Sequence, residues 1–163
     1  MNGLDVKRLL QMQAKLDDHI EREHGLKEVD TTEEKLLALQ VELGELANET
    51  RCFKFWSLKP ASDRNVILEE YVDGLHFILS LGLSFAYDWK PESVEGEETL
   101  VSAFLRTFER IAAFRNAPTE HHYNVLFSTY LMLGEQLGFS GVDIQSAYED
   151  KNATNHERQE QGY

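Results

Sequence analysis

The sequence predicts an all-α protein, a compact bundle of five to six or more helices in a single domain of residues 1–163. Three observations support this fold class. Apolar residues recur at helical spacing over most of the chain, and no segment alternates with period two. The prolines Pro60, Pro91 and Pro118 all fall between the periodic segments, where they punctuate helices.

The first helix is expected over residues 3–24, because apolar side chains recur there every three or four positions and Gly25 can end it. The second helix is expected to begin after Thr31, which forms a capping-box pattern with Glu34. It is expected to continue to about Phe55.

Residues 57–63 form the next loop, with Ser62 or Asp63 as the N-cap of a helix over residues 63–87. This helix is apolar on nearly every side, which predicts a central position in the bundle. A polar connection follows it.

Two further amphipathic helices are expected over residues 97–115 and 119–137, separated by a break that contains a proline. Gly138 ends the second of them, and Ser140 begins a last helix. The polar end of the chain, residues 150–163, has few apolar side chains that could pack. It is expected to be a mobile segment, ordered only in part.

The formal net charge is −13, from 29 acidic against 16 basic residues. Such a field repels nucleic-acid polymers and anionic membranes, so neither is expected as a partner. A small polyanionic substrate remains compatible with this charge if divalent cations bridge it to the protein.

The single cysteine, Cys52, excludes an intramolecular disulfide framework and fits the reducing environment of the cytoplasm. The N-terminal residues MNGLDVKRLL contain an acid and no apolar core, so no signal peptide is visible. The longest apolar stretch, residues 74–87, is too short to span a membrane. A cytoplasmic location is therefore expected.

Three acids lie among apolar residues in the second helix. Glu42, Glu45 and Glu49 fall within a wedge of about 60° on the helix surface. The apolar residues on the two sides of this wedge are Leu36, Leu39, Leu43 and Leu46, and Leu37 and Val41. If both apolar sides pack, the acids are drawn toward the interior.

The third helix repeats the pattern with Glu70 and Asp73. Burying a carboxylate without a partner costs several kcal/mol, and two such pairs on neighbouring helices would repel each other unless a cation lies between them. Hard oxygen ligands select Mg²⁺, Mn²⁺ or Ca²⁺ rather than zinc. We therefore expect a metal cage of four carboxylates: Glu42, Glu45, Glu70 and Asp73.

The segments ELGE (residues 42–45) and EYVD (residues 70–73) resemble the ExxE…ExxD signature of the all-α nucleoside triphosphate pyrophosphatases. Within that superfamily the chain resembles the dimeric dUTPases most. The supporting segments are MQAKLD (12–17), RCFKFWS (51–57), EEYVDGLHF (69–77) and DKNATNHER (150–158). The likeness runs from the first helix to the C-terminus and is weakest between about residues 88 and 140.

The resemblance implies a homodimeric enzyme that hydrolyses dUTP, and also dUDP, to dUMP and so limits the incorporation of uracil into DNA. The four carboxylates would hold two or three Mg²⁺ ions, with Mn²⁺ as a possible substitute, against the phosphates. Glu45 would accept the proton of the attacking water, with Glu42 as the second catalytic carboxylate. Glu49 is expected to be either an outer acid of the site or a plain helix-face glutamate.

The resemblance also implies contacts to the nucleotide. Gln13 matches an amide that reads the base, while Leu16 stands where some relatives have an asparagine. Phe77 would stack on the nucleotide and His76 would meet the deoxyribose. Further expected contacts are Lys54 and Trp56 after the acidic helix and Lys151, Asn155 and Arg158 near the C-terminus, with Asn152 and Tyr163 as weaker candidates.

Three alternatives remain open at the level of sequence. A MazG-like pyrophosphatase would share the metal cage and act on a different base. A di-iron carboxylate bundle requires paired E-x-x-H motifs, and only residues 21–24 fit, with Asp73 and His76 as an imperfect second pair. In a non-catalytic helical interaction module, the acids would lie on the surface without a catalytic role.

Overall fold

The computed structural model describes residues 1–163 and contains six helices and no strands, which confirms the predicted all-α bundle. The helices are α1 (Val6–His24), α2 (Thr32–Thr50), α3 (Arg64–Phe85), α4 (Leu100–Asn116), α5 (Glu120–Gln136) and α6 (Gly141–Glu160). A single cluster of buried hydrophobic side chains draws members from all six. None of the helices combines the length and the apolar composition that crossing a membrane requires.

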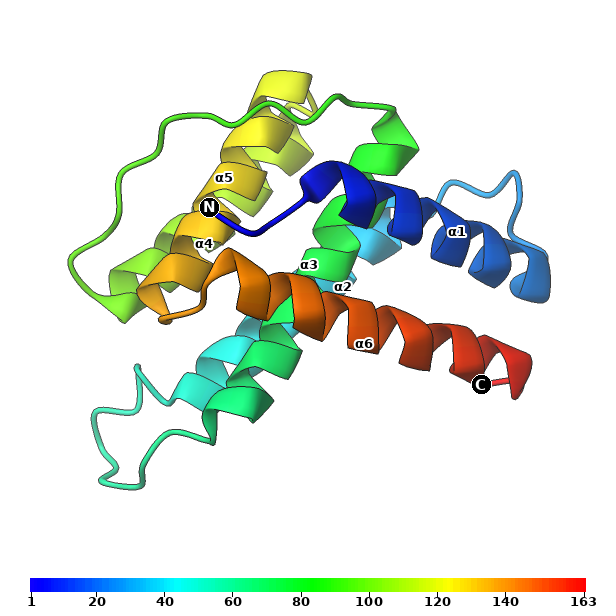
Figure 1. Cartoon of the computed structure of the whole chain (residues 1–163). Coiled ribbons are helices and arrows are strands. Elements are labelled where there is room, and N and C mark those ends of the chain that lie inside the picture. The colour runs from blue at the N-terminus through cyan, green and yellow to red at the C-terminus, as the bar shows by residue number, and fades with distance from the viewer.

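Helix α3 is central, as its apolar sequence predicts. It pairs with α2, to which the loop of residues 51–63 connects it, and it also contacts α1, α5 and α6. Helices α4 and α5 form a second pair beside α2 and α3, while α1 and α6 run side by side in the same direction across α3 (Figure 1). The site described below lies where α2, α3 and α6 meet.

The long connection between α3 and α4 has no secondary structure of its own, but it is attached to α5. The main-chain amides of Lys90 and Glu92 donate to Asn124 Oδ1 at 3.1 Å and Ser128 Oγ at 2.9 Å. These two acceptors are one turn apart on α5. The polar side chains of α5 therefore satisfy amides that a loop cannot pair by itself.

Helix α2 ends at Thr50 and does not reach Phe55, so the predicted boundary is wrong. Arg51 adopts a left-handed conformation with φ of 58°, and its amide still bonds back to the helix. Its guanidinium donates to the Lys59 main-chain oxygen at 3.0 Å and to Ser57 Oγ at 2.7 Å. Both bonds join Arg51 to residues later in the loop, so they stabilise the bend at Arg51 and not a continuation of helix α2.

The predicted capping box at the start of α2 does not form. Thr31 is the N-cap residue, but its side chain makes no capping hydrogen bond to the helix. Thr32 instead donates its amide and its hydroxyl to Asp30 Oδ1, at 3.0 and 2.6 Å. A capping box does start α6, at Ser140, which confirms that boundary. The other predicted boundaries lie within a few residues of the observed ones.

Helix α6 continues to Glu160, through most of the segment 150–163 that was expected to be ordered only in part. Tyr148 and Asn152 are buried against α1, and Asn152 lies within 3.5 Å of the Met12 main-chain oxygen. The order of this polar helix comes from contacts with a helix at the other end of the sequence. The closing of this segment over a nucleotide stays a prediction.

Only one of the two apolar sides predicted for α2 is buried in this chain. The buried side consists of Leu36, Leu39, Leu43 and Leu46, which face α3 and α4. Leu37 and Val41 are 63% and 48% exposed, so the single chain does not cover the second apolar side of α2. The acids therefore lie at the boundary between the buried and the exposed face of α2.

Candidate metal and substrate site

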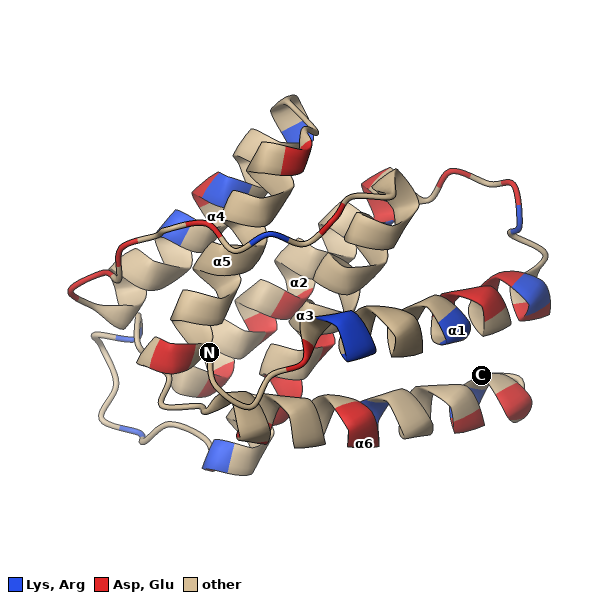
Figure 2. Cartoon of the chain, turned by 45° about the horizontal axis from the view of Figure 1, so that its top comes forward, with Lys and Arg blue, Asp and Glu red and all other residues tan.

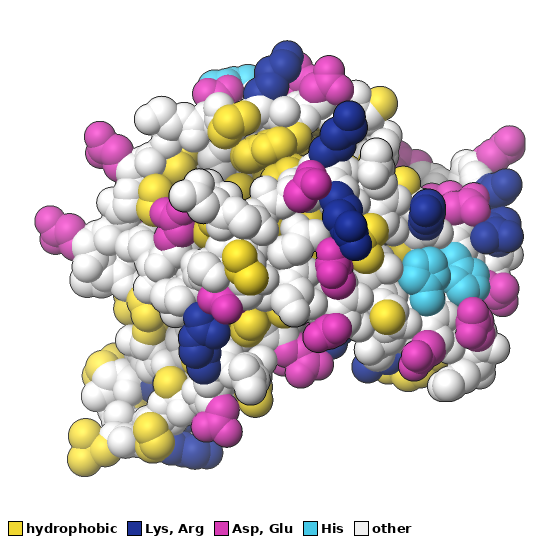
Figure 3. Space-filling model, in the orientation of Figure 1, with side chains coloured by type: hydrophobic (Ala, Val, Ile, Leu, Met, Phe, Trp, Pro, Cys, Tyr) yellow, Lys and Arg dark blue, Asp and Glu magenta, His cyan; other side chains and the backbone are white.

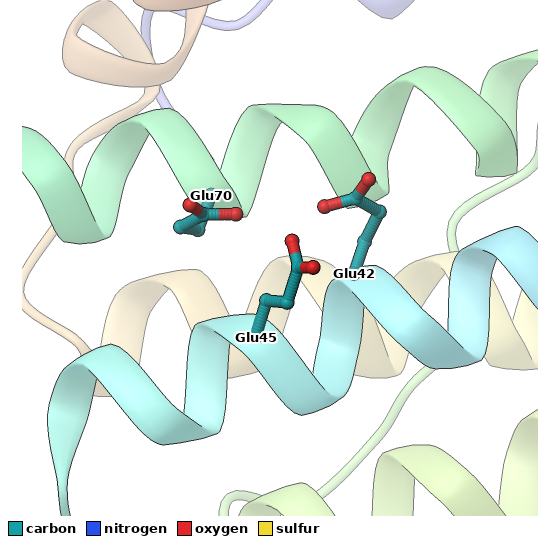
Figure 4. Close-up of side chains that lie close together, drawn as sticks. All are labelled: Glu42, Glu45 and Glu70. Carbon is teal, nitrogen blue, oxygen red and sulfur yellow. The ribbon is translucent and has the colours of Figure 1, made fainter.

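Three of the four predicted metal ligands lie together. Glu42 and Glu45 extend from successive turns of α2, and Glu70 extends from α3 into the same space (Figure 4). One carboxylate oxygen of each lies within 4.8 Å of the others. The pairing of α2 with α3 brings the two sequence motifs together, and acidic positions mark both helices in Figure 2. We call these residues the carboxylate triad.

The fourth predicted ligand, Asp73, lies beside the triad without being part of it. Its Oδ1 is 3.2 Å from Lys151 Nζ, which also donates to Glu69 Oε1 at 2.8 Å. The cluster therefore contains three of the four predicted ligands, and Asp73 is paired with a lysine of α6. Asp73 is nevertheless near enough for its charge to act on Glu42.

The acids strongly disfavour one another's ionisation. Burial, followed by the charges of Asp73 and Glu45, raises the pKa of Glu42 to about 8. Burial and the same two neighbours raise the pKa of Glu70 to about 7. Burial also raises the pKa of Asp73, although Lys151 opposes this shift. The site thus concentrates negative charge that the protein's own cations offset only in part.

The triad has the properties of a site for a hard divalent cation. Glu42 Oε2 is buried and has no hydrogen-bond partner, which is costly unless another group pairs with it. The three clustered residues offer oxygen ligands only, a set that suits Mg²⁺, Mn²⁺ or Ca²⁺ rather than zinc. The E-x-x-H pair of Glu21 and His24 contributes nothing to this cluster, so the di-iron alternative gains no support.

A groove of about 220 Å³ adjoins the triad. We call it the site groove, and it is lined by Ile20, Glu42, Asp73, His76, Phe77, Lys151, Asn155, Arg158, Gln159 and Tyr163. It thus brings six predicted substrate residues, five on α3 and α6 and Tyr163 after the end of α6, together with two predicted metal ligands. A larger groove of about 490 Å³ elsewhere between α3 and α6 shares only Lys151 with the predicted site.

The groove carries cations on the α6 side and aromatic rings from α3. The Arg158 guanidinium lies over the ring of Tyr163, 5.1 Å from its centre. His76 and Phe77 meet edge to face, with ring centres 4.8 Å apart. Burial, together with the charges of Lys35 and Lys151, lowers the pKa of His76 to about 4. His76 is therefore neutral at physiological pH.

Lys54 and Trp56 do not line the site groove. They belong to the loop of residues 51–63, where Trp56 is 65% exposed and packs its ring against Phe53 and Phe55. Hydrophobic side chains gather at the lower left of Figure 3, where Figure 1 draws this loop. The contacts of Lys54 and Trp56 with a nucleotide therefore stay a prediction, which the groove of the single chain does not include.

Gln13 is completely buried and is also absent from the groove walls. Its Oε1 accepts a hydrogen bond from the Tyr148 hydroxyl at 2.7 Å, and its Nε2 donates to Asp17 Oδ1 at 2.9 Å. Asp17 also accepts from Ser80 Oγ. Asp17 was not among the predicted site residues, and its partner Ser80 lies on a different helix.

Two weaker candidates have structural partners. Asn152 is buried against α1 and does not reach the groove. Glu49 accepts a hydrogen bond from Ser62 Oγ, which holds the end of the loop to α2. The charge of Glu49 also contributes to the raised pKa of Glu70, after burial and the nearer acids. Glu49 therefore lies beside the triad and acts on it electrostatically.

Comparison with known proteins adds one match. A family model described as dUTPase matches residues 5–163, which is nearly the whole chain. No curated protein matches the sequence.

Proposed function

Since the chain belongs to the dUTPase family, we propose that it is a metal-dependent dUTP diphosphatase. It hydrolyses dUTP to dUMP and pyrophosphate, also cleaves dUDP, and so limits the incorporation of uracil into DNA. The observation that carries this proposal is the site groove, where Glu42 and Asp73 face Lys151 and Arg158. Carboxylates for cations and cations for phosphates are what a nucleoside triphosphate needs.

Glu42, Glu45 and Glu70 would hold Mg²⁺, two or three ions in all, and Mn²⁺ would be an alternative. We propose Asp73 as a fourth ligand. Lys151, which pairs with Asp73 here, then becomes available to phosphate oxygens. Bound Mg²⁺ would neutralise phosphate charge and lower the pKa of a coordinated water.

Glu45 is the proposed acceptor of the proton from the attacking water, and Glu42 is the second catalytic carboxylate. Glu45 is exposed, so water reaches it, and it lies one turn from Glu42 on α2. Glu42 is more enclosed, and its unpaired Oε2 is suited to holding a cation rather than to exchanging protons with solvent.

The nucleoside is proposed to lie against α3, with Phe77 stacked on it and His76 beside the deoxyribose. Because His76 is neutral and enclosed, its ring adds bulk without charge and disfavours a 2′-hydroxyl. Lys151, Asn155 and Arg158 would contact the nucleotide from α6, as residues 150–163 close over it.

A homodimer accounts for the apolar surface that the single chain leaves exposed. Leu37 and Val41 on α2 are exposed, as are Phe55, Trp56 and Leu58 on the loop that follows α2. Several large apolar side chains exposed on neighbouring segments are typical of an interface. We propose that a second copy of the chain covers α2 and this loop, while Lys54 and Trp56 remain proposed nucleotide contacts.

A screen of pyrophosphate and phosphate release from nucleotides, with and without Mg²⁺, tests the proposed function. The expected order is dUTP and dUDP far above dTTP, dCTP and UTP, with no release in the presence of a chelator. A flat profile across deoxynucleotides, or a preference for a purine, would assign the chain to the MazG-like alternative. Inertness toward every deoxynucleotide would leave only a non-catalytic role.

A further inference from the structure

A pair of histidines joins the outer halves of α1 and α6. His19 on α1 and His156 on α6 stack with ring centres 5.1 Å apart and ring planes inclined by 25°. Their Nδ1 atoms lie 2.9 Å from each other. Histidine side chains are visible at the right of Figure 3, where Figure 1 draws the ends of α1 and α6. We call these two residues the histidine pair, and the carboxylate triad shares no residue with it.

The same short sequence pattern follows both histidines. Residues 19–23 read HIERE and residues 156–160 read HERQE, so each helix carries a histidine and, four positions later, a glutamate. Positions four apart lie on one face of a helix. Because α1 and α6 run side by side in the same direction, Glu23 and Glu160 both lie one turn beyond the histidine pair (Figure 1). The packing of the two helices therefore gathers two imidazoles and two carboxylates at their outer ends.

The Nδ1 atoms of the histidine pair are potential nitrogen ligands. A neutral imidazole carries its hydrogen on one ring nitrogen and has a lone pair on the other. The close approach of the two Nδ1 atoms requires that at least one of them is unprotonated, because two N–H groups would otherwise point at each other. Burial, together with the charge of His19, lowers the pKa of His156, although Glu160 opposes this shift. The neutral ring, which is the form that binds metal ions, is therefore favoured at His156.

The spacing of the two Nδ1 atoms is that of two ligands on one metal ion. Bonds from zinc to histidine nitrogen are about 2.0–2.1 Å long, so two such nitrogens are about 2.9 Å apart at a right angle and about 3.4 Å apart at a tetrahedral angle. The observed separation of 2.9 Å matches the first of these values. Glu23 Oε1 is 3.9 Å from His19 Nε2, and both Glu23 and Glu160 are exposed and free to change rotamer. From one turn away, each carboxylate can reach an ion bound to the histidine of its own helix.

We propose that the histidine pair, with Glu23 and Glu160, forms a second metal site that takes one transition-metal ion of the Zn²⁺, Ni²⁺ or Cu²⁺ class. Imidazole ligands suit these ions, whereas Mg²⁺ and Ca²⁺ prefer oxygen ligands. The carboxylate triad offers oxygen only, so the two sites prefer different metals. The proposal does not depend on the proposed function, because it concerns the contact of two helices and not the nucleotide.

A metal ion at the histidine pair would fasten the end of α6 to α1. His156 directly follows Asn155 and His19 directly precedes Ile20, and both Asn155 and Ile20 line the site groove. The ion would therefore hold together two walls of that groove. Because the ligands come together only in the folded chain, binding should also raise Tm.

The experiment titrates the full chain with Zn²⁺ in a calorimeter, in the presence of excess Mg²⁺ so that sites with oxygen ligands only are occupied. The rise in Tm on addition of Zn²⁺ is the second readout. The variants are His19→Asn and His156→Asn, whose amides keep a hydrogen-bonding group near the place of Nδ1 and so preserve the contact between the helices. A further variant combines Glu23→Gln with Glu160→Gln.

The matched control is His121→Ala. His121 on α5 is exposed and has its Nδ1 3.2 Å from a carboxylate oxygen of Glu92, so it is a histidine beside a glutamate without a second imidazole. Loss of any metal binding that a single surface histidine provides would appear in this control.

We expect the wild type and His121→Ala to bind one Zn²⁺ ion per chain with the same Kd. His19→Asn and His156→Asn should each raise that Kd by about tenfold or more, because the ion loses one of its two nitrogen ligands. The double glutamate variant should raise the Kd by a smaller factor. Zn²⁺ should raise the Tm of the wild type and of the control, and should change the Tm of the two histidine variants little.

A Kd for Zn²⁺ that neither histidine variant changes would place the ion elsewhere, for example at the carboxylate triad, and would overturn the proposal. A wild type that binds no Zn²⁺ in the presence of Mg²⁺ would do the same, as would an equal loss of binding in His121→Ala. If one of the two histidine variants does not fold, the other decides, since each removes one nitrogen ligand. An unchanged Kd in the double glutamate variant would remove Glu23 and Glu160 from the site.

Discussion

Tyr71 and Tyr130 each donate a hydrogen bond to the main-chain carbonyl oxygen of the other, at 2.8 and 2.5 Å. Their rings stack with centres 4.6 Å apart, and both are completely buried between α3 and α5. Tyr71 directly follows Glu70 in the sequence, so this contact holds in place the turn of α3 that carries half of the acidic site.

The reciprocal hydrogen bonds of Tyr71 and Tyr130 require a glycine on each helix, Gly74 on α3 and Gly134 on α5, because each glycine faces the other helix's tyrosine hydroxyl. This requirement gives the first prediction. A Cβ at Gly74 would overlap the Tyr130 hydroxyl. We expect Gly74→Ala to lower the free energy of unfolding by about 1–3 kcal/mol, as is typical of overpacking in a dense core. Gly44→Ala in α2 is the control, since a Cβ there meets no atom within 4 Å. Gly44→Ala should stabilise the protein by about 0.5–1 kcal/mol in denaturant titrations. Equal effects of Gly74→Ala and Gly44→Ala on the free energy of unfolding would contradict the steric argument.

The second prediction concerns the proposed ligands. Glu45→Gln, Glu70→Gln and Asp73→Asn should each lower kcat for dUTP by about 100-fold or more, because each removes an anionic ligand from the cation site. The metal-free Glu45→Gln and Glu70→Gln variants should be at least as stable as the wild type, since one repelling charge is gone. Asp73→Asn also removes the ion pair with Lys151, so no gain in stability is expected from it. Glu34→Gln, an exposed acid in the first turn of the same helix, is the control. Near-normal turnover of any of the three would remove that residue from the site.

The third prediction is the pH dependence of stability without metal. The folded-state pKa values of Glu42 and Glu70, about 8 and about 7, exceed the ordinary value of 4.5, so the folded protein binds more protons than the unfolded chain between these values. The stabilisation from these two groups is complete below 4.5 and is lost as pH rises through 7 and 8.

In Tm measurements with a chelator, the wild type should therefore lose stability between pH 5 and about pH 8. Glu42→Gln should show a shallower decline, and Mg²⁺ should raise the Tm most at the alkaline end, where the carboxylates are ionised. If the Tm of Glu42→Gln falls as steeply with pH as that of the wild type, groups other than Glu42 cause the decline.

The fourth prediction concerns the cations of α6. Arg158→Ala should raise KM for dUTP by about tenfold, since it removes a charge-assisted bond to phosphate. It should change Tm little, because the guanidinium lies over the exposed Tyr163 ring and acts on Glu69 and Asp73 only as a weak lowering of their pKa values. Arg106→Ala on α4, which breaks two exposed ion pairs and does not line the groove, is the control. An unchanged KM in Arg158→Ala would show that Arg158 faces solvent and does not contact the nucleotide. Deletion after Glu149 is a poorer test, because it also removes the buried Asn152.

The fifth prediction is a dimer through α2. Leu37→Glu should shift the protein toward a monomer in light scattering, because it places a charge in the proposed interface. Val142→Glu on α6 is the control, since Leu37 and Val142 are both 63% exposed in the single chain. A wild type that is monomeric at micromolar concentration, or equal effects of the two substitutions, would contradict the proposed interface.

The sequence was informative where the relevant contacts are local. The spacing of Glu42 and Glu45, and of Glu70 and Asp73, identified the acidic faces of two helices, and the structure brings three of the four together. The same spacing did not show that Leu37 and Val41 are exposed in the single chain. Helical periodicity shows that a face is apolar, but it does not show whether the same chain covers it.

The remaining differences come from side-chain hydrogen bonds outside the helix itself, some to the following loop and some to partners distant in the sequence. The end of α2 depends on bonds from Arg51 to the following loop, and the order of α6 depends on α1. Asp17 could not be recognised as a buried acid from its own helix, because Ser80 lies 63 positions away. Polar residues acquire such roles only through tertiary packing, which no local pattern records.

The side-by-side arrangement of α1 and α6 has a consequence for the order of events during synthesis. Residues that meet across these helices are far apart in the sequence, by 135 positions for Gln13 and Tyr148 and by 137 for His19 and His156. At a synthesis rate of roughly 5–20 residues per second, α6 is therefore made on the order of ten seconds after α1. Until then the acids of α2 and α3 have no Lys151 or Arg158 beside them, and Gln13 has no Tyr148. The nascent chain is thus expected to pair its central helices first and to acquire nucleotide binding as its last step.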